Sequence, residues 1–271
     1  MKKYSTVLTI AGSDSGGGAG VQADIKTISA CGCYAASAIT AITVQNTLGV
    51  TDVHAVPVSV LSGQIEAVLS DIGADAVKIG MLHSSEVVRA VAAKLSEHKI
   101  TNIVLDPVMV STSGHKLIED SAIETLMEVL IPMARVITPN IPEAEILLGG
   151  QKLTCQDTLP EAAEKLAKKF GVSVLLKAGH LTEDKLVDIF YDNETGTTHF
   201  LPSVRIYTKN THGTGCTMSS AFASMLAKGL DLVKAAEGAK NFINDAIVAG
   251  AEYEIGHGFG PVCHFHKLWK A

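Results

Sequence analysis

The chain has 271 residues, of which 47% are hydrophobic and only 5% aromatic, so it is long enough to bury a large core. Its net charge at pH 7 is −6 and it has no block of lysine or arginine, which argues against a nucleic-acid-binding or anionic-membrane-binding surface. The five cysteines are scattered without a C-x-x-C pair, so we expect no disulfide framework or zinc site, and a reducing, cytoplasmic location.

Short runs rich in β-branched residues alternate with amphipathic stretches along the chain. In order, we expect a strand at 6–11, a helix at 19–31, a strand at 38–44, a helix at 58–72, a strand at 76–79, a helix at 85–98, a strand at 103–105, a helix at 121–130, a strand at 136–138, a helix at 161–170, a strand at 174–177, a hairpin of 187–191 and 197–200, and helices at 217–228 and 232–249. This alternation predicts an α/β fold with right-handed crossovers and a mainly parallel sheet. We expect one domain, residues 1–271, and no membrane span, because no segment approaches roughly 18 consecutive apolar residues.

Ligands of such sheets bind beyond the carboxyl ends of the strands, where this chain places two glycine-rich segments. The first, GSDSGGGAG at 12–20, follows a strand and opens a helix, but it matches neither common nucleotide-binding fingerprint. Glycine permits close backbone approach to a ligand, so we interpret the segment as a ligand loop; a flexible turn is the alternative.

The second segment, NTHGTGC at 210–216, directly precedes the helix expected from 217. Free backbone N–H groups and the positive end of a helix dipole make such a junction an anion site, and phosphate is the usual anion. Cys216 stands at its mouth, where the helix end favours thiolate over thiol, so we expect a lowered pKa for its thiol. A buried, inert cysteine is the alternative. Together these features suggest phosphoryl transfer.

Polar residues mark other early elements. Asp24 lies in the first helix and is either a solvated carboxylate or an acceptor for a substrate amine or hydroxyl. Gln45 ends the second strand, where an amide suits the edge of a heterocycle or an ordinary turn. Lys78 lies in a buried-looking strand and needs a partner unless that strand is at an edge, and Met81 would pack on a planar ring or in the core.

Later strand ends carry charged groups. Asp106 ends one strand, and Asn140 and Glu143 follow the next. Two carboxylates at adjacent strand ends are able to hold Mg²⁺, partly through waters, whereas helix N-caps are the alternative for each. Lys177 ends a further strand, from which a point charge would reach a transferring phosphate; a surface lysine is the competing interpretation.

These segments, taken in order, resemble the hydroxymethylpyrimidine/phosphomethylpyrimidine kinases of thiamine biosynthesis, in the ribokinase-like superfamily. The matching segments are AGSDSGGGAGVQADIKT, AITVQNT, KIGML, VLDPVM, ITPNIPEAE, LLKAGH, TKNTHGTGCT and GHGFGPV. The resemblance covers residues 7–269 and implies a three-layer α/β/α fold with a mostly parallel central sheet, ATP and Mg²⁺ as cofactors, and a homodimer. The implied substrate is 4-amino-5-hydroxymethyl-2-methylpyrimidine and then its monophosphate.

The resemblance also implies roles for residues. Those implied to contact the pyrimidine are Gly12, Asp24, Gln45 and Met81. Those implied to serve ATP and its phosphates are Asp106, Asn140, Glu143, Lys177 and Thr214, with Asp106 and Glu143 as the metal ligands. The implied anion hole comprises Gly213, Thr214 and Gly215, and Cys216 is the implied general base, where sugar kinases carry aspartate.

Two alternatives remain open at this point. A pyridoxal or pyridoxine kinase of the same superfamily is the nearer one, and Gln45 favours the aminopyrimidine over it. The second is a non-catalytic pyrimidine-binding protein, which would be expected to lose Asp106, Glu143, Lys177 or Cys216.

Overall fold

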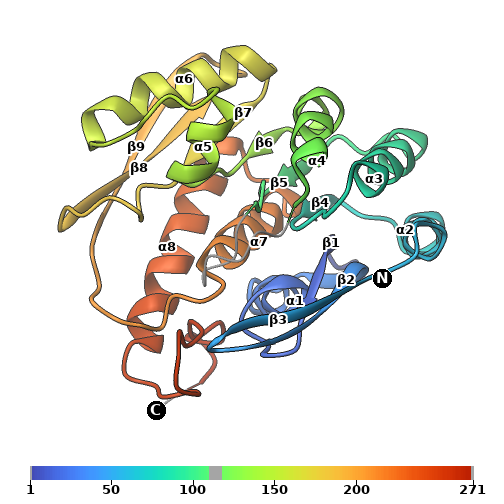
Figure 1. Cartoon of the computed structure of the whole chain (residues 1–271), viewed down its shortest axis with the longest axis horizontal. Helices are drawn as coiled ribbons and strands as arrows, with labels where there is room; N and C mark the ends of the chain where they lie inside the picture. Colours follow the sequence, from blue (N-terminus) through green and yellow to red (C-terminus); the bar gives the residue numbers. More distant parts are fainter. Residues whose placement is uncertain (1, 110–117, 270–271) are drawn as a thin grey trace.

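The computed structural model describes residues 2–109 and 118–269. Within them, nine strands form one sheet in the order β3-β2-β1-β4-β5-β6-β7-β8-β9 (Figure 1). The six strands from β2 to β7 in this order run parallel, whereas β3, β8 and β9 join as antiparallel neighbours. The expected α/β fold with a mostly parallel sheet is confirmed.

The strands are β1 (Thr6–Asp14), β2 (Tyr34–Asn46), β3 (Gly49–Ala55), β4 (Ala76–Ile79), β5 (Ile103–Leu105), β6 (Val136–Ile137), β7 (Ser173–Leu176), β8 (Lys185–Asp192) and β9 (Thr197–Val204). The α-helices are α1 (Gly20–Ala30), α2 (Val58–Asp71), α3 (Ser85–Glu97), α4 (Asp120–Thr125), α5 (Ile141–Leu147), α6 (Leu159–Phe170), α7 (Thr214–Ala227) and α8 (Leu232–Gly250). A π-helical turn, η1 (Leu126–Leu130), and a 3-10 turn, η2 (Ile131–Met133), continue α4, and a second 3-10 turn, η3 (Gln156–Thr158), precedes α6.

Helices cover both faces of the sheet, which gives the three layers (Figure 1). The two faces arise from the alternation of side chains along each strand. Leu8 and Leu105 belong to the core under α2 to α6, whereas their neighbours Val7 and Val104 belong to the core under α1, α7 and α8. Buried parallel strands therefore read as continuous apolar runs in the sequence.

Strand β2 (Tyr34–Asn46) is longer than the expected 38–44, and the helix expected at 121–130 is divided into α4 and η1. Three further differences have a clear physical reason. Strand β3 was not predicted, because most of its residues are exposed and its sequence, GVTDVHA, lacks a hydrophobic face. Helix α5 was not predicted either; it has only seven residues, too short for a helical repeat to be read. Helix α7 begins at Thr214 instead of residue 217, so the GTGC segment forms its N-cap and first turn.

Parallel pairing brings the carboxyl ends of β1, β2, β4, β5, β6 and β7 to one edge of the sheet. The carboxyl ends of these strands, together with the segments that follow them, carry most of the candidate site residues, so the topology gathers them. Among the described residues, every helix is too short or too polar to cross a membrane.

Candidate functional site

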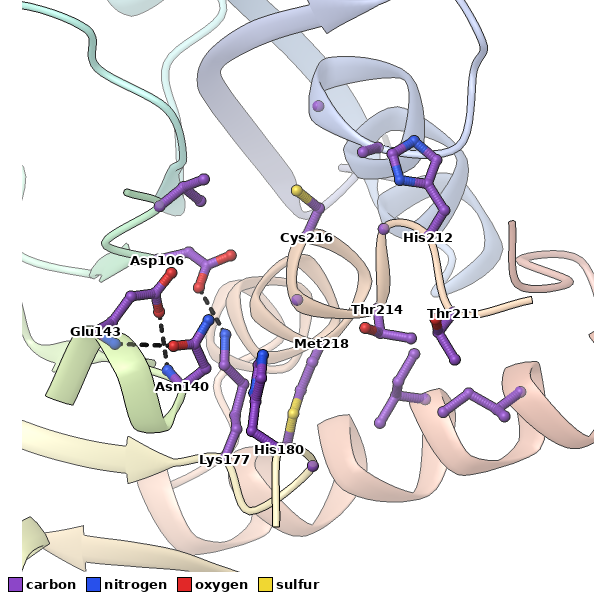
Figure 2. Close-up of a pocket in the computed structure, with 18 of the residues that line it drawn as sticks. Asp106, Asn140, Glu143, Lys177, His180, Thr211, His212, Thr214, Cys216 and Met218 are labelled. Carbon is purple, nitrogen blue, oxygen red and sulfur yellow. Dashed lines mark hydrogen bonds and ion pairs between the residues drawn. The ribbon is translucent and has the colours of Figure 1, made fainter. Parts of the chain in front are cut away.

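A cavity of about 670 Å³ opens over this edge of the sheet. Its wall combines the strand ends, the first turn of α7 and one face of α8 (Figure 2). The predicted site residues that line it are Gly12, Gln45, Met81, Asp106, Asn140, Glu143, Lys177, Gly213, Thr214, Gly215 and Cys216. Only Asp24, of the predicted set, is missing from this wall.

The first turn of α7 has the geometry of an anion site. Gly213 is its N-cap in the left-handed conformation, with φ +79°. A β-carbon at residue 213 would lie 1.8 Å from the carbonyl oxygen of Gly18, so only glycine fits. Within the described residues, the N–H groups of Gly215 and Cys216 have no backbone acceptor, as expected at a helix N-terminus. They are available to an anion in the cavity.

An ion pair lies against this turn. Lys177 Nζ is 2.9 Å from Asp106 Oδ1, which also accepts a hydrogen bond from Thr138 Oγ1 at 3.0 Å (Figure 2). A β-carbon on Gly215 would stand 3.3 Å from Lys177 Nζ and 3.4 Å from Asp106 Oδ2. The missing side chain at 215 therefore lets the ammonium group approach the free N–H groups. Lys177 is mostly buried, so it is not an ordinary surface lysine.

Both members of the pair stay charged. Burial raises the pKa of Asp106, but the cations Lys177 and Lys78 outweigh it and hold that pKa below its ordinary value. Burial lowers the pKa of Lys177, but Asp106 and Glu143 reverse this and leave it raised. The pair therefore presents a buried carboxylate and a buried ammonium group to the cavity at neutral pH.

Asn140 and Glu143 form a capping box at the start of α5. The Asn140 side chain accepts from the Glu143 N–H at 2.9 Å, and Glu143 Oε2 accepts from the Asn140 N–H at 2.8 Å (Figure 2). The helix-cap alternative thus describes these two residues. Burial, with a contribution from nearby Asp106, also raises the pKa of Glu143 to about 7. Lys177 and the N–H groups of Asn140 and Met109 act in the opposite direction but do not outweigh the loss of hydration, so a second, harder-to-charge carboxyl group lies near Asp106.

Cys216 corrects one expectation. Its side chain is partly exposed to the cavity, but burial raises the pKa of its thiol to about 11, whereas the sequence predicted a lowered value. Lys78 and the Gly20 N–H act in the opposite direction. The prediction considered the helix end alone; the loss of hydration, with Asp24 and Asp106 nearby, is the larger effect here.

Asp24 corrects a second expectation, that its carboxylate would contact the pyrimidine. Its carboxylate is fully buried behind the cavity wall, where it accepts from Thr9 and Ser220 and pairs with Lys78. Both of its carboxylate oxygens are bonded to groups behind the cavity wall, so in this structure Asp24 does not reach the position expected for the pyrimidine. The same contact supplies the partner that Lys78 was expected to need.

Gln45 belongs to a hydrogen-bonded group whose other members the sequence analysis missed. Its Nε2 lies 3.3 Å from His212 Nε2, which is 2.8 Å from Asp14 Oδ2, and its Oε1 accepts from Thr43 Oγ1. Asp14 also accepts from N–H groups of the glycine-rich loop at Gly16, Gly18 and Ala19. The loop is therefore ordered by a carboxylate inside its own motif, and Met81 packs nearby against Gly12.

The signal for Asp14 and His212 was present in the sequence, because both lie inside the glycine-rich motifs. A second missed pair, Lys240 and Asp188, lines the opposite side of the cavity with Nζ 2.6 Å from Oδ2. No sequence signal distinguishes Lys240 from other helical lysines.

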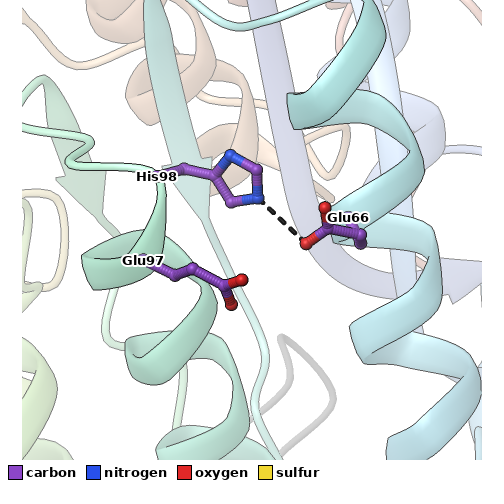
Figure 3. A group of neighbouring side chains, drawn as sticks. All are labelled: Glu66, Glu97 and His98. Atoms are coloured by element: carbon purple, nitrogen blue, oxygen red, sulfur yellow. Dashed lines mark hydrogen bonds and ion pairs between the residues drawn. The ribbon is translucent and has the colours of Figure 1, made fainter.

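A separate group, Glu66, Glu97 and His98, gathers where α2 meets α3 (Figure 3). Lys94 Nζ lies 2.9 Å from Glu66 Oε2 and 2.8 Å from Glu97 Oε2, so an ammonium group already bridges the two carboxylates. This group is an ion-pair network outside the cavity.

Comparison with known proteins agrees with this geometry. The phosphomethylpyrimidine kinase family matches residues 14–263. The hydroxymethylpyrimidine/phosphomethylpyrimidine kinase of Rhizobium meliloti is 48% identical over 97% of this chain and 98% of its own. The solved phosphomethylpyrimidine kinase of Clostridium difficile is 43% identical with a TM-score of 0.77, over 89% of this chain and 99% of its own. The ADP complex of Bacillus subtilis pyridoxal kinase is 37% identical with a TM-score of 0.88, over 97% of this chain and 98% of its own.

Gly213→Ala should destabilise the chain strongly, by about 3 kcal/mol or more, because the new β-carbon meets the Gly18 carbonyl and the backbone is left-handed. Gly229→Ala is the matched control, with φ +81° but open space around it, and should cost only about 1 kcal/mol. Urea denaturation measures both, and equal losses would contradict the close contact.

Glu143→Gln should change how stability depends on pH. The raised pKa means that the folded chain keeps a proton which the unfolded chain releases above about pH 4.5, so Glu143 lowers stability as pH rises from there to about 7. Glutamine keeps the capping box but has no proton to lose. The free energy of unfolding of the variant, relative to that of the original chain, should therefore rise by about 3 kcal/mol between pH 4.5 and 7. Denaturation series without divalent cations test this, with exposed Glu161→Gln as control; a flat difference would contradict it.

Proposed function

We propose that this chain, which belongs to the phosphomethylpyrimidine kinase family, phosphorylates 4-amino-5-hydroxymethyl-2-methylpyrimidine and then its monophosphate, using ATP, in thiamine biosynthesis. The observation that carries the proposal is the first turn of α7, where free N–H groups, Lys177 and Cys216 converge on one cavity. A migrating phosphoryl group needs charge compensation and positioning more than covalent help, and this turn offers both.

The roles follow from position. The N–H groups of Gly215 and Cys216 would bind the oxygens of the terminal phosphate, and Lys177 would add a positive charge as negative charge shifts toward the leaving group. Gln45, oriented by Thr43 and His212, would bind the pyrimidine edge, because an amide both donates and accepts. Cys216 would take the hydroxyl proton from the substrate.

Asp106 and Glu143 fit a Mg²⁺ site. Both offer carboxylate oxygens as metal ligands on the cavity wall. The two negative charges repel each other, and a divalent cation between them would remove this repulsion. When bound, the ion would neutralise phosphate charge. In the capping box the Asn140 N–H binds the carboxyl group of Glu143 and so fixes its position on the cavity wall.

An ATP-consumption assay offering hydroxymethylpyrimidine, its monophosphate and pyridoxal side by side tests the proposal. We expect turnover with both pyrimidines. Pyridoxal is the second candidate substrate, favoured by the likeness to the Bacillus subtilis pyridoxal kinase. Turnover with pyridoxal alone would make the chain a pyridoxal kinase, and binding of pyrimidine without turnover would make it a non-catalytic binding protein.

Cys216→Ala should lower turnover of hydroxymethylpyrimidine far more than it weakens pyrimidine binding. Turnover by the original chain should also rise with pH above 7, because a thiol with a pKa of about 11 gains thiolate as pH rises, and the variant should lose this rise. The monophosphate is an internal control, since its acceptor oxygen is already ionised and needs no base. Equal losses of turnover and binding would contradict the base role.

We further propose that the chain forms one kinase domain, 1–271, and acts in the cytoplasm. We also propose that it forms a homodimer through the antiparallel pair of strands β2 and β3. Thr43 and Gln45 line the cavity, so their neighbours Ile42 and Val44 face the opposite way, and they are 50% and 56% exposed. Two adjacent exposed apolar side chains on a strand near the sheet edge suit a partner surface.

Ile42→Lys should therefore shift the chain toward monomer in light scattering coupled to size-exclusion chromatography. Phe200→Lys is a suitable control, because Phe200 is 61% exposed on β9 at the other end of the sheet. An unchanged mass for Ile42→Lys, or a monomer before any substitution, would contradict this interface.

A further inference from the structure

A buried ion pair lies behind the cavity wall and takes no direct part in the proposed chemistry. Lys78 on β4 and Asp24 on α1 have fully buried side chains, and Lys78 Nζ lies 2.9 Å from both carboxylate oxygens. Thr9 Oγ1 and Ser220 Oγ donate to the same carboxylate at 2.6 and 2.7 Å. Replacing a buried ion pair by apolar residues often leaves the stability of the fold unchanged or increases it. We therefore look for a role of this pair other than stabilising the fold.

The register of two packed helices places this pair directly beneath Cys216. Cys216 and Ser220 are four residues apart on α7, and Gly20 and Asp24 are four residues apart on α1, so each pair occupies one helix face. The Gly20 N–H lies close enough to the Cys216 sulfur to lower its pKa at one level, and Ser220 Oγ donates to Asp24 one turn further along. The ion pair is thus about one helical turn below the thiol.

We propose that Lys78 is a positioning residue that holds a buried positive charge under Cys216 and stabilises its thiolate, with Asp24 fixing the ammonium group in place. Its catalytic consequence rests on the proposed function, in which Cys216 accepts a proton. The electrostatic claim itself concerns only the sulfur and needs no substrate.

The charges around the sulfur agree with this assignment. Burial is the main cause of the raised pKa of Cys216, and Lys78 is the leading group that opposes it, ahead of the opposite effects of Asp24 and Asp106. Lys177, beyond β7, also faces the thiol. Burial lowers the pKa of Lys78, but Asp24 reverses this, so Lys78 remains an ammonium group throughout the useful pH range.

The direct test is the pH profile of Cys216 alkylation by iodoacetamide, followed by mass spectrometry of the peptide that carries Cys216. Brief pulses between pH 8 and 12.5 bracket the thiol pKa of about 11 and would give a midpoint, which reports the pKa, and a fitted plateau, which reports access. The variants are Lys78→Met and the double variant Lys78→Met with Asp24→Asn. The double variant leaves no buried charge without a partner, so it carries the test if the single variant does not fold.

The matched control is Lys240→Met with Asp188→Asn, which removes another buried lysine–aspartate pair, with an N–O distance of 2.6 Å, from the other side of the cavity. Circular dichroism confirms folding at each pH. For Lys78→Met we expect the midpoint to rise by about one pH unit, so that alkylation below the midpoint is about tenfold slower; the double variant should show a smaller rise, because Asp24→Asn also removes a negative charge that raises the thiol pKa. The control should keep the original midpoint.

An unchanged or lowered midpoint in the Lys78 variants would overturn the proposal, and so would an equal rise in the control. A change in the plateau alone would also overturn it, because it would mean altered access without altered charge. If the midpoint rises while no pyrimidine is phosphorylated by the unmodified chain, the proposed function fails and the role of Lys78 at the sulfur stands.

Discussion

The close approach of the α7 N-terminus to the strand ends depends on the absence of side chains at two glycines. Gly213 leaves room for the Gly18 carbonyl and adopts a left-handed backbone, which turns the chain into the helix. Gly215 leaves room for the ion pair of Lys177 with Asp106. Because both contacts are made by backbone, the free N–H groups point into the cavity instead of being covered by side chains.

Burial and charge oppose each other throughout this site, and the outcome differs from group to group. Asp106 has cations beside it and keeps a pKa below its ordinary value, whereas burial raises the pKa values of Glu143 and Cys216. Glu143 and Cys216, whose pKa values are raised, both line the cavity, and pKa values shifted in this way are common at functional sites. Lys78 differs from all of these, since its charge is satisfied by Asp24 and still acts on the thiol.

Much of the fold was readable from the sequence because buried parallel strands and amphipathic helices leave distinct periodic patterns. Strand β3 left no such pattern, because most of its residues are exposed, and α5 was too short to show one. The site motifs were also readable, since each follows a strand end, but Asp14 and His212 were overlooked inside them. Their importance comes from contacts with Gln45 and the loop N–H groups, and His212 is far from both in sequence.

The succession of most strands and helices along the chain, the glycine-rich segments and the charged residues at strand ends were determined by the sequence alone, since each depends on local pattern. The order of the strands within the sheet was decided by the tertiary structure. Tertiary structure decided the ionisation of Cys216 and the direction in which Asp24 points. Both depend on what packs around a group: the loss of water raises the thiol pKa, and Lys78 on strand β4 draws the carboxylate of helix α1 inward. Such effects join residues from separate elements, so no local pattern in the chain contains them.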